Sequence, residues 1–418
     1  MEGNTAWILT SAALVLFMVP GLALFYGGMV RAKNALNMLN MNMWCLGIVP
    51  VVWVLLGWSL ASGDSGRSWL GDLSVVGLKG VHDVEGLASF AFLMTFACIT
   101  PALISGAVAD RMKFSAWMVF VPIWSLVVYA PVVYWIYGAD GWIFNLPAHD
   151  FAGGTAIHVN AGAAALALAI VLGKRSGWPQ NRPAPHNVPF VMLGAGILWF
   201  GWFGFNAGSA LAANGAAAQA FVNTFLAAAA GMVAWMLVEL AKTGKASTIG
   251  MASGVVAALV AITPAAGFVG SMHSLVFGAA AGVICFYAIE AKFRLGFDDS
   301  LDVVGIHLVG GAVGGILLGF MADSSAVPGG DFIDGVFFGG GVLLWNQILS
   351  IVAVASFSFV ATFIIAKVLD KAIGLRVSES TEMAGLDVSD HGEAAYVIDG
   401  GEAAYEIDGG EAAYEIDG

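Results

Sequence analysis

The stretches DFAGGTAIHVNAG, residues 150–162, and DDSLDVVGIHLVGG, residues 298–311, decide the fold of this chain. Each places a histidine inside an apolar segment of membrane length. In each the histidine follows an aspartate by eight residues: His158 follows Asp150, and His307 follows Asp299. Ionisable side chains in hydrocarbon are rare without a role. The matched spacing predicts two related repeats that bring two imidazoles together near the bilayer midplane, as in a transport path.

The composition is that of a membrane protein. Of the 418 residues, 59% are hydrophobic and 11% are charged, against about 25% charged in a typical soluble domain. One soluble core could not bury so many apolar segments. Despite a net charge of −13 there is no basic stripe for nucleic acid. Because Cys45, Cys98 and Cys285 lack metal-ligand spacing, we expect no metal and no cofactor.

Eleven apolar runs reach the length of about 20 residues that a helix needs to cross a bilayer. They cover residues 6–30, 39–62, 87–109, 115–137, 152–173, 188–210, 215–241, 247–267, 271–290, 301–322 and 340–366. With the N-terminus outside, fourteen of the sixteen Lys and Arg lie in cytoplasmic segments, and only Arg67 and Lys79 lie outside. We therefore predict an all-α polytopic protein with eleven transmembrane helices, N-out and C-in.

The two histidine segments belong to a longer internal repeat. AIHVNAGAA at 156–164 is similar to GIHLVGGAV at 305–313, and LFYGG at 24–28 is weakly similar to GFNAG at 204–208. Matching spans are five apart, and an odd offset reverses the direction of crossing. Spans 1–5 and 6–10 therefore form inverted repeats, and span 11 is an extra helix.

Two interpretations of the paired residues stay open from the pattern alone. Asp150 can cap its helix through the backbone N–H groups of Gly153 or Gly154, or its charge can attract a cation. Burial disfavours an imidazolium, so we expect His158 and His307 to form a neutral pair. That pair can line a path or simply hold two helices together.

Several long motifs, in order, resemble the Amt/MEP/Rh ammonium transporter family, most closely its bacterial Amt members. Besides the two histidine stretches they are TFACITPALISGAVADRMKFSA at 95–116, PHNVPFVMLGAGILWFGWFGFNAGSA at 185–210 and GLDVSDHGEAAY at 385–396. The resemblance implies an ammonium transporter and not an enzyme. It also implies a homotrimer with one pore per subunit, a multi-pass location in the inner (plasma) membrane, and a PII signal-transduction protein as a cytoplasmic partner.

The resemblance also implies roles for single residues. Phe96 and Phe205 match two stacked rings that close the outer end of the pore, and His158 and His307 match the histidines that line it. The residues that it places in the external ammonium site are Trp202, Ser209, Phe96, Tyr137 and Asp150. Tyr137 stands where the family usually has a tryptophan.

The chemistry of ammonium fits such a path. Moving the bare cation through a low-dielectric throat costs on the order of tens of kcal/mol in the Born limit, whereas neutral ammonia avoids most of that cost. An indole face attracts a cation by about 0.5–2 kcal/mol. Potassium would be attracted too, but it has no proton to lose, and an apolar lumen offers no oxygen ligands to replace its water.

The chain divides at residue 376 into a transmembrane transporter domain, 1–376, and a polar cytoplasmic tail, 377–418. The segment GEAAYxIDG occurs three times in the tail, at 392–400, 401–409 and 410–418. Two alternatives to transport remain. One is an ammonium sensor that signals through a partner, for which the tail is too short to form a separate domain. The other is an intramembrane metal enzyme, which no HExxH motif or carboxylate cluster supports.

Overall fold

A computed structural model describes residues 2–180 and 183–396. The second and third GEAAYxIDG repeats and the last four residues of the first lie outside the described residues. In the described part every regular element is a helix, joined by loops, and there is no β-strand. The predicted all-α class is confirmed.

Ten helical segments among the described residues are long and apolar enough to cross a membrane. Four of them contain a single π-helical turn: η2 (Trp53–Gly57), η4 (Ser125–Tyr129), η5 (Gly154–Val159) and η6 (Val304–Leu308). In chain order the segments are α1 (Glu2–Met29), α2 to α3 (Ala35–Val52, Trp58–Ser62), α4 (Val84–Val108), α5 to α6 (Phe114–Trp124, Ala130–Tyr137), η5 with α7 (Gly154–Leu172, α7 itself being Asn160–Leu172), α8 (Val188–Gly208), α9 (Gly215–Thr243), α11 (Ser271–Leu295), η6 with α12 (Val304–Met321, α12 itself being Val309–Met321) and α13 (Gly341–Ile373).

The predicted span at 247–267 is a shorter helix, α10 (Thr248–Ile262), of 15 residues. It ends where Pro264 follows, because proline has no N–H to donate to the carbonyl of Val260. Its residues from Ala252 to Ile262 are all buried, and it packs against α8, α9, α11 and α12. Ten of the eleven predicted spans therefore reach membrane length as helices.

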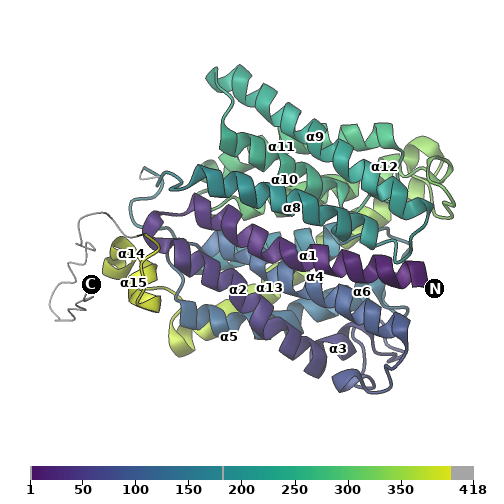
Figure 1. The fold of residues 1–418 in the computed structure, drawn as a ribbon, viewed down its shortest axis with the longest axis horizontal. Coiled ribbons are helices and arrows are strands. Elements are labelled where there is room, and N and C mark those ends of the chain that lie inside the picture. The colour runs from purple at the N-terminus through teal and green to yellow at the C-terminus, as the bar shows by residue number, and fades with distance from the viewer. Residues whose placement is uncertain (1, 181–182, 397–418) are drawn as a thin grey trace.

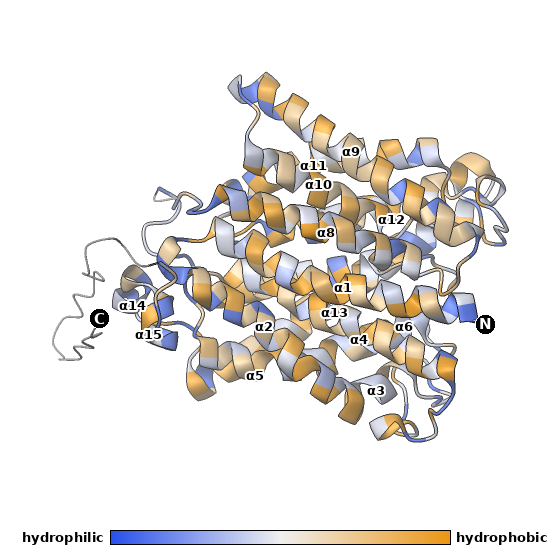
Figure 2. Ribbon diagram, in the orientation of Figure 1, coloured by the Kyte–Doolittle hydropathy of each residue, from blue (hydrophilic) through white to orange (hydrophobic). Residues whose placement is uncertain are grey.

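The helices form one bundle, with the start of the first helix and the helices of the tail at opposite ends (Figure 1). We call the end where α1 begins the N-terminal end, and the end where α14 (Glu379–Ala384) and α15 (Leu386–His391) lie the tail end. Helices α1 and α8 lie side by side along the middle. Apolar residues cover the helices along their length, and hydrophilic ones gather in the loops and at α14 and α15 (Figure 2).

The start of the tail is bound to the membrane bundle by polar contacts. Asp387 accepts hydrogen bonds from the backbone N–H groups of Leu36 (3.0 Å) and Asn37 (2.8 Å) at the start of α2, where helical N–H groups lack partners. Burial raises the pKa of this carboxyl, and the backbone N–H groups oppose that rise. The Glu382 carboxylate forms an ion pair with the Arg376 guanidinium, in which Nη2 and Oε2 are 2.7 Å apart. These contacts fix α14 and α15 at the tail end.

Candidate functional site

The two histidines meet in the middle of the bundle, each on a π-helical turn. His158 lies on η5 and His307 on η6. Their Nδ1 atoms are 3.2 Å apart, and their ring centroids are 5.2 Å apart with the planes inclined by 20°. Both side chains are buried, with 1% and 2% of their surface exposed. The structure therefore brings the two imidazoles together, as the repeated spacing predicts.

Two glycines at the same position of the repeat allow this close approach. Gly162 and Gly311 each follow their histidine by four residues. A Cβ atom on Gly162 would lie 2.4 Å from the backbone N of Leu308 on η6, and one on Gly311 would lie 2.7 Å from the carbonyl oxygen of Gly154 on η5. Each histidine helix thus packs a bare backbone against the π turn of the other.

Asp150 caps the first histidine helix. Its carboxylate accepts hydrogen bonds from four successive backbone N–H groups, at 2.9, 2.6, 2.9 and 3.0 Å, from residues 153 to 156. These groups have no partner within the helix. Burial raises the pKa of the Asp150 carboxyl, and the four N–H groups oppose that rise. The predicted capping role is confirmed, while the attraction of a cation stays a prediction.

Asp299 holds the second histidine helix differently. Its Oδ2 accepts the N–H of Val304 at 2.7 Å, and its Oδ1 is buried without a hydrogen-bond partner among the described residues. Burial raises the pKa of the Asp299 carboxyl to about 6. Lys292 donates to the carbonyl oxygen of Asp299 (2.6 Å) and to Asp302 (2.5 Å).

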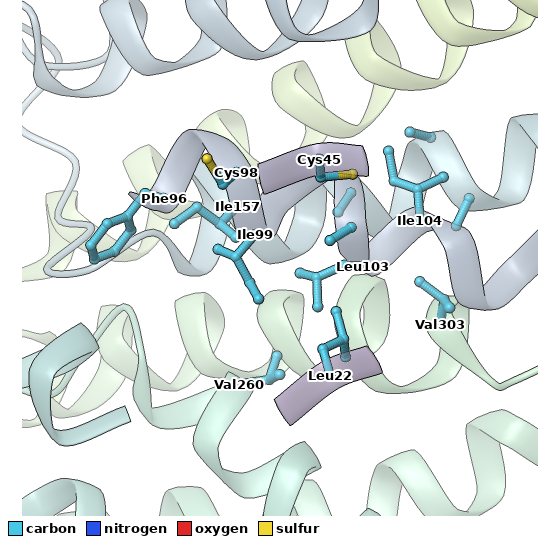
Figure 3. Close-up of a cluster of buried hydrophobic side chains, with 14 of the residues drawn as sticks. Leu22, Cys45, Phe96, Cys98, Ile99, Leu103, Ile104, Ile157, Val260 and Val303 are labelled. Atoms are coloured by element: carbon cyan, nitrogen blue, oxygen red, sulfur yellow. The ribbon is translucent and has the colours of Figure 1, made fainter. Parts of the chain in front are cut away.

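A narrow cavity lies against the two imidazoles. It leaves about 10 Å³ for the centre of a water-sized molecule, which is the room that one such molecule needs. Figure 3 shows Leu22 of α1 and Ile99 and Leu103 of α4 gathered in this apolar region. The lining residues are Met18, Leu22, Ile99, Leu103, Leu198, Trp202, Phe205, Val256, His158 and His307. Nε2 of His158 is buried and has no hydrogen-bond partner in the described part of the chain.

Aromatic rings continue from the histidines toward the N-terminal end. Phe205 contacts His158, with centroids 5.9 Å apart, and Phe96, with centroids 4.3 Å apart. Phe96 in turn contacts Phe92 at 4.7 Å. The rings of Phe96 and Phe205 are 3% and 1% exposed. The two phenylalanine rings are therefore buried and in contact, with their planes inclined by 36°; their role as a gate stays a prediction.

Trp202 and Ser209 do not share one place. The indole of Trp202 is 2% exposed and stacks on His158, with centroids 5.4 Å apart, and its Nε1 donates to Thr263 at 2.9 Å. Ser209 lies just beyond the end of α8 and seven residues after Trp202. This spacing places it about 10 Å further along the helix axis. The structure thus places Trp202 on the buried cavity and Ser209 further toward the N-terminal end, and the roles in the external site that the resemblance implies for them stay predictions.

Tyr137, the last residue of α6, is 37% exposed. No ring contact joins it to Phe96 or Trp202 in the described residues. Sequence reasoning missed Thr263 and Phe92, which hold Trp202 and Phe96. No motif marks either residue, because their positions follow from the packing of other helices.

The arrangement defines a class of protein: a helical membrane protein with a small, buried, mostly apolar cavity bordered by two imidazoles. Within residues 2–180 and 183–396, no three His, Cys, Asp or Glu side chains are grouped to hold a metal ion. The cavity fits a molecule of the size of water. A cavity of this size and lining suits a small, weakly polar molecule.

Comparison with known proteins gives the family. Residues 6–396 match the Ammonium Transporter Family, and the chain belongs to it. It is 50% identical to the ammonium transporter of Mycobacterium bovis, covering 94% of this chain and 90% of that protein. It is 46% identical to the ammonium transporter of Bacillus subtilis, covering 94% and 98%. The resemblance read from the motifs is confirmed, and the relatives are named as transporters.

Solved structures agree with this assignment. The fold matches Mep2 of Candida albicans with a TM-score of 0.87 at 37% identity, covering 94% of this chain and 90% of that one. It also matches a structure named a sensor Amt protein, with a TM-score of 0.87 at 27% identity, covering 93% and 98%. The chain is therefore a multi-pass membrane protein with the Amt/Mep fold.

Proposed function

We propose that this ammonium transporter recruits the cation at the N-terminal end, removes its proton, and conducts ammonia past His158 and His307. The observation that carries the proposal is the buried imidazole pair on an apolar cavity, with one ring nitrogen unpartnered. A permanent cation would lose its hydration there and gain no set of oxygen ligands. Neutral ammonia carries no charge, so one hydrogen-bond donor and one acceptor from the protein are enough to hold it there.

The histidine pair supplies both. Two Nδ1 atoms 3.2 Å apart share one hydrogen, so one neutral ring has a bare Nε2 and the other has its hydrogen on Nε2. The pair then presents one acceptor and one donor. When the bare Nε2 takes up a proton, the shared hydrogen crosses to the other ring, and that ring releases the hydrogen on its own Nε2. These three transfers leave both rings neutral, exchange their roles and carry one proton across the pair, as a relay of protons requires.

In this proposal the recruiting residues are those toward the N-terminal end. Phe96, Ser209, Tyr137 and Asp150 form or charge the external site, and Phe205 closes it together with Phe96. Trp202 acts deeper, where its indole face borders the cavity beside His158. A cation that reaches this face is stabilised by about 0.5–2 kcal/mol, next to the imidazole that would accept its proton.

We also propose eleven crossings, N-out and C-in. Helices α14 and α15 lie at the tail end of the bundle and α1 begins at the opposite end (Figure 1), so the chain between them crosses an odd number of times. Ten long segments together with α10 make eleven. Fourteen of the sixteen Lys and Arg then lie in cytoplasmic segments. The plasma membrane, the homotrimer and the PII partner are proposals carried over from the family resemblance.

Sensing is a second candidate, which the likeness to a sensor Amt protein favours. Both candidates predict ammonium binding, and only the first predicts net transport. Signalling that persists in a variant without transport, such as His158→Ala, would favour the sensor.

The test is reconstitution in liposomes with an inward ammonium gradient and records of current and internal pH at two pH values. We expect His158→Ala and His307→Ala each to lower the ammonium-driven signal by about tenfold or more, because a lost buried hydrogen bond of about 1.5 kcal/mol corresponds to that factor. His82→Ala, an exposed histidine in a loop, is the control and should transport normally. Unchanged signals in both pore variants would overturn the proposal.

A further inference from the structure

The described part of the first tail repeat, residues 392–396, contacts the residues just before α8, and this beginning of α8 lies at the tail end of the bundle. The hydroxyl of Tyr396 lies 2.8 Å from Nε2 of His186 and 3.4 Å from Nδ2 of Asn187, and the rings of Tyr396 and His186 meet edge to face at 5.4 Å. Asn187 caps α8 by accepting the N–H of Phe190 at 3.0 Å. We call His186 and Asn187 the tyrosine site.

The hydrogen-bond partners of His186 fix what the site recognises. Its Nδ1 lies 2.9 Å from the carbonyl oxygen of Val30, and because a carbonyl only accepts, Nδ1 must carry the hydrogen. In the neutral ring Nε2 is then an acceptor, so the tyrosine hydroxyl donates to it. Asn187 donates to the same hydroxyl oxygen. The site is therefore built for a group that both donates and accepts, as a phenol does.

The segment that reaches this site is repeated in the sequence. GEAAY at 392–396 recurs without change at 401–405 and 410–414, and each copy ends in a tyrosine: Tyr396, Tyr405 or Tyr414. The chain is anchored just before the first copy. The ring of His391 contacts Asn37 (3.0 Å) and Asn40 (3.2 Å), and Asp390 accepts the N–H of Phe114 at 3.0 Å.

We propose that GEAAY is a docking unit and that the tyrosine site accepts any one of the three tyrosines of its own chain. The three hydroxyls lie five, fourteen and twenty-three residues beyond the His391 anchor. Because closure of a loop becomes less probable as the −3/2 power of its length, Tyr405 and Tyr414 dock about fivefold and about tenfold less often than Tyr396. The repeats thus keep the tail bound when one tyrosine is lost.

Disulfide cross-linking in membranes tests this directly, because Cys45, Cys98 and Cys285 are buried. Ala184→Cys places a thiol at an exposed position two residues before His186. It is combined in turn with Ala395→Cys, Ala404→Cys or Ala413→Cys, each next to one tyrosine. Mild oxidation and mass spectrometry measure the yield within one chain. We expect yields in the ratio of about 1 to one-fifth to one-tenth.

Phenylalanine variants separate docking from random encounter, since they remove only the hydroxyl. Tyr396→Phe should raise the yields at 404 and 413, while Tyr405→Phe should lower the yield at 404 and leave that at 395 unchanged. His186→Ala should lower all three. If the cross-link yields at 404 and 413 did not change when the adjacent tyrosine, Tyr405 or Tyr414, is replaced by phenylalanine, the proposal would be overturned. Links formed only between two chains would also overturn it, since they would make another copy the occupant.

Discussion

The two histidine helices share an aspartate–histidine spacing but are held at their starts in different ways. Asp150 accepts hydrogen bonds from four backbone N–H groups, whereas Asp299 has those of Val304 and Val303, and one of its buried oxygens has no partner in the described part of the molecule. The eight-residue spacing therefore fixes where each histidine helix begins. How firmly the helix is held depends on the turn between the aspartate and the histidine, which differs between the two halves.

The largest expected effect is that of Asp150→Asn. An amide has one oxygen and one NH₂, so two of the four N–H groups would face a donor. Losing two hydrogen bonds to a charged acceptor costs about 3 kcal/mol or more of unfolding free energy. Because the same turn positions His158, ammonium transport should fall by about tenfold or more. Thermal unfolding in detergent and liposome uptake measure the two losses.

Asp83→Asn is the matched control for that change. Asp83 is an exposed N-cap of α4 that accepts one backbone N–H, from Gly86 at 2.7 Å, and asparagine caps nearly as well as aspartate. We expect almost no change in either measurement. If Asp150→Asn behaved like this control, the four-fold capping would not matter for the first histidine helix.

The sequence predicts the parts of the site that depend on local spacing. The aspartate–histidine repeats predicted the contact between His158 and His307, and the helix-start signature predicted the cap by Asp150. Hydropathy placed ten helices of membrane length. For α10 it overestimated the length, because Pro264 ends a helix inside a run that stays apolar.

The parts that depend on packing could not be predicted. No residue pattern pointed to the π-helical turns η5 and η6, which lie where the two histidine helices approach most closely. The depth of Trp202 has the same origin. Its motif orders Trp202, Phe205 and Ser209 along α8, but only the neighbouring helices and Thr263 decide that the indole lies beside His158.

The second prediction compares the glycines that let the two helices cross. Gly162→Ala would place Cβ 2.4 Å from the backbone N and 2.7 Å from the Cα of Leu308. Gly311→Ala would meet the Gly154 oxygen at 2.7 Å and Val159 at 3.1 Å or more. We expect losses of about 2–3 and about 1–2 kcal/mol, respectively, because backbone must move in both cases. Unfolding in detergent gives the order.

Gly196→Ala on α8 is the control, because a Cβ there meets nothing within 4 Å. Alanine in an open helical position stabilises by up to about 1 kcal/mol over glycine. Losses at both crossing glycines, with none at Gly196, would show that the contact itself needs the bare backbones. A harmless Gly162→Ala would show that the histidine helices have room to separate.

The smallest expected effect is that of Asp299→Asn. Its oxygen can still accept the N–H of Val304, and its NH₂ can occupy the position of the unpartnered oxygen, so transport should change by less than about twofold.

The effect of Asp299→Asn on stability depends on pH. Burial raises the pKa of Asp299 from 3.8 to about 6, so the folded protein binds this proton more tightly than the unfolded chain, and the parent loses stability as the pH rises from about 4 to about 6. Asparagine does not titrate. The variant should therefore match the parent near pH 4 and gain stability relative to it by pH 7. Thermal unfolding at both pH values measures this difference; a variant that lost stability at pH 7 as Asp150→Asn does would mean that the two aspartates hold their helices alike.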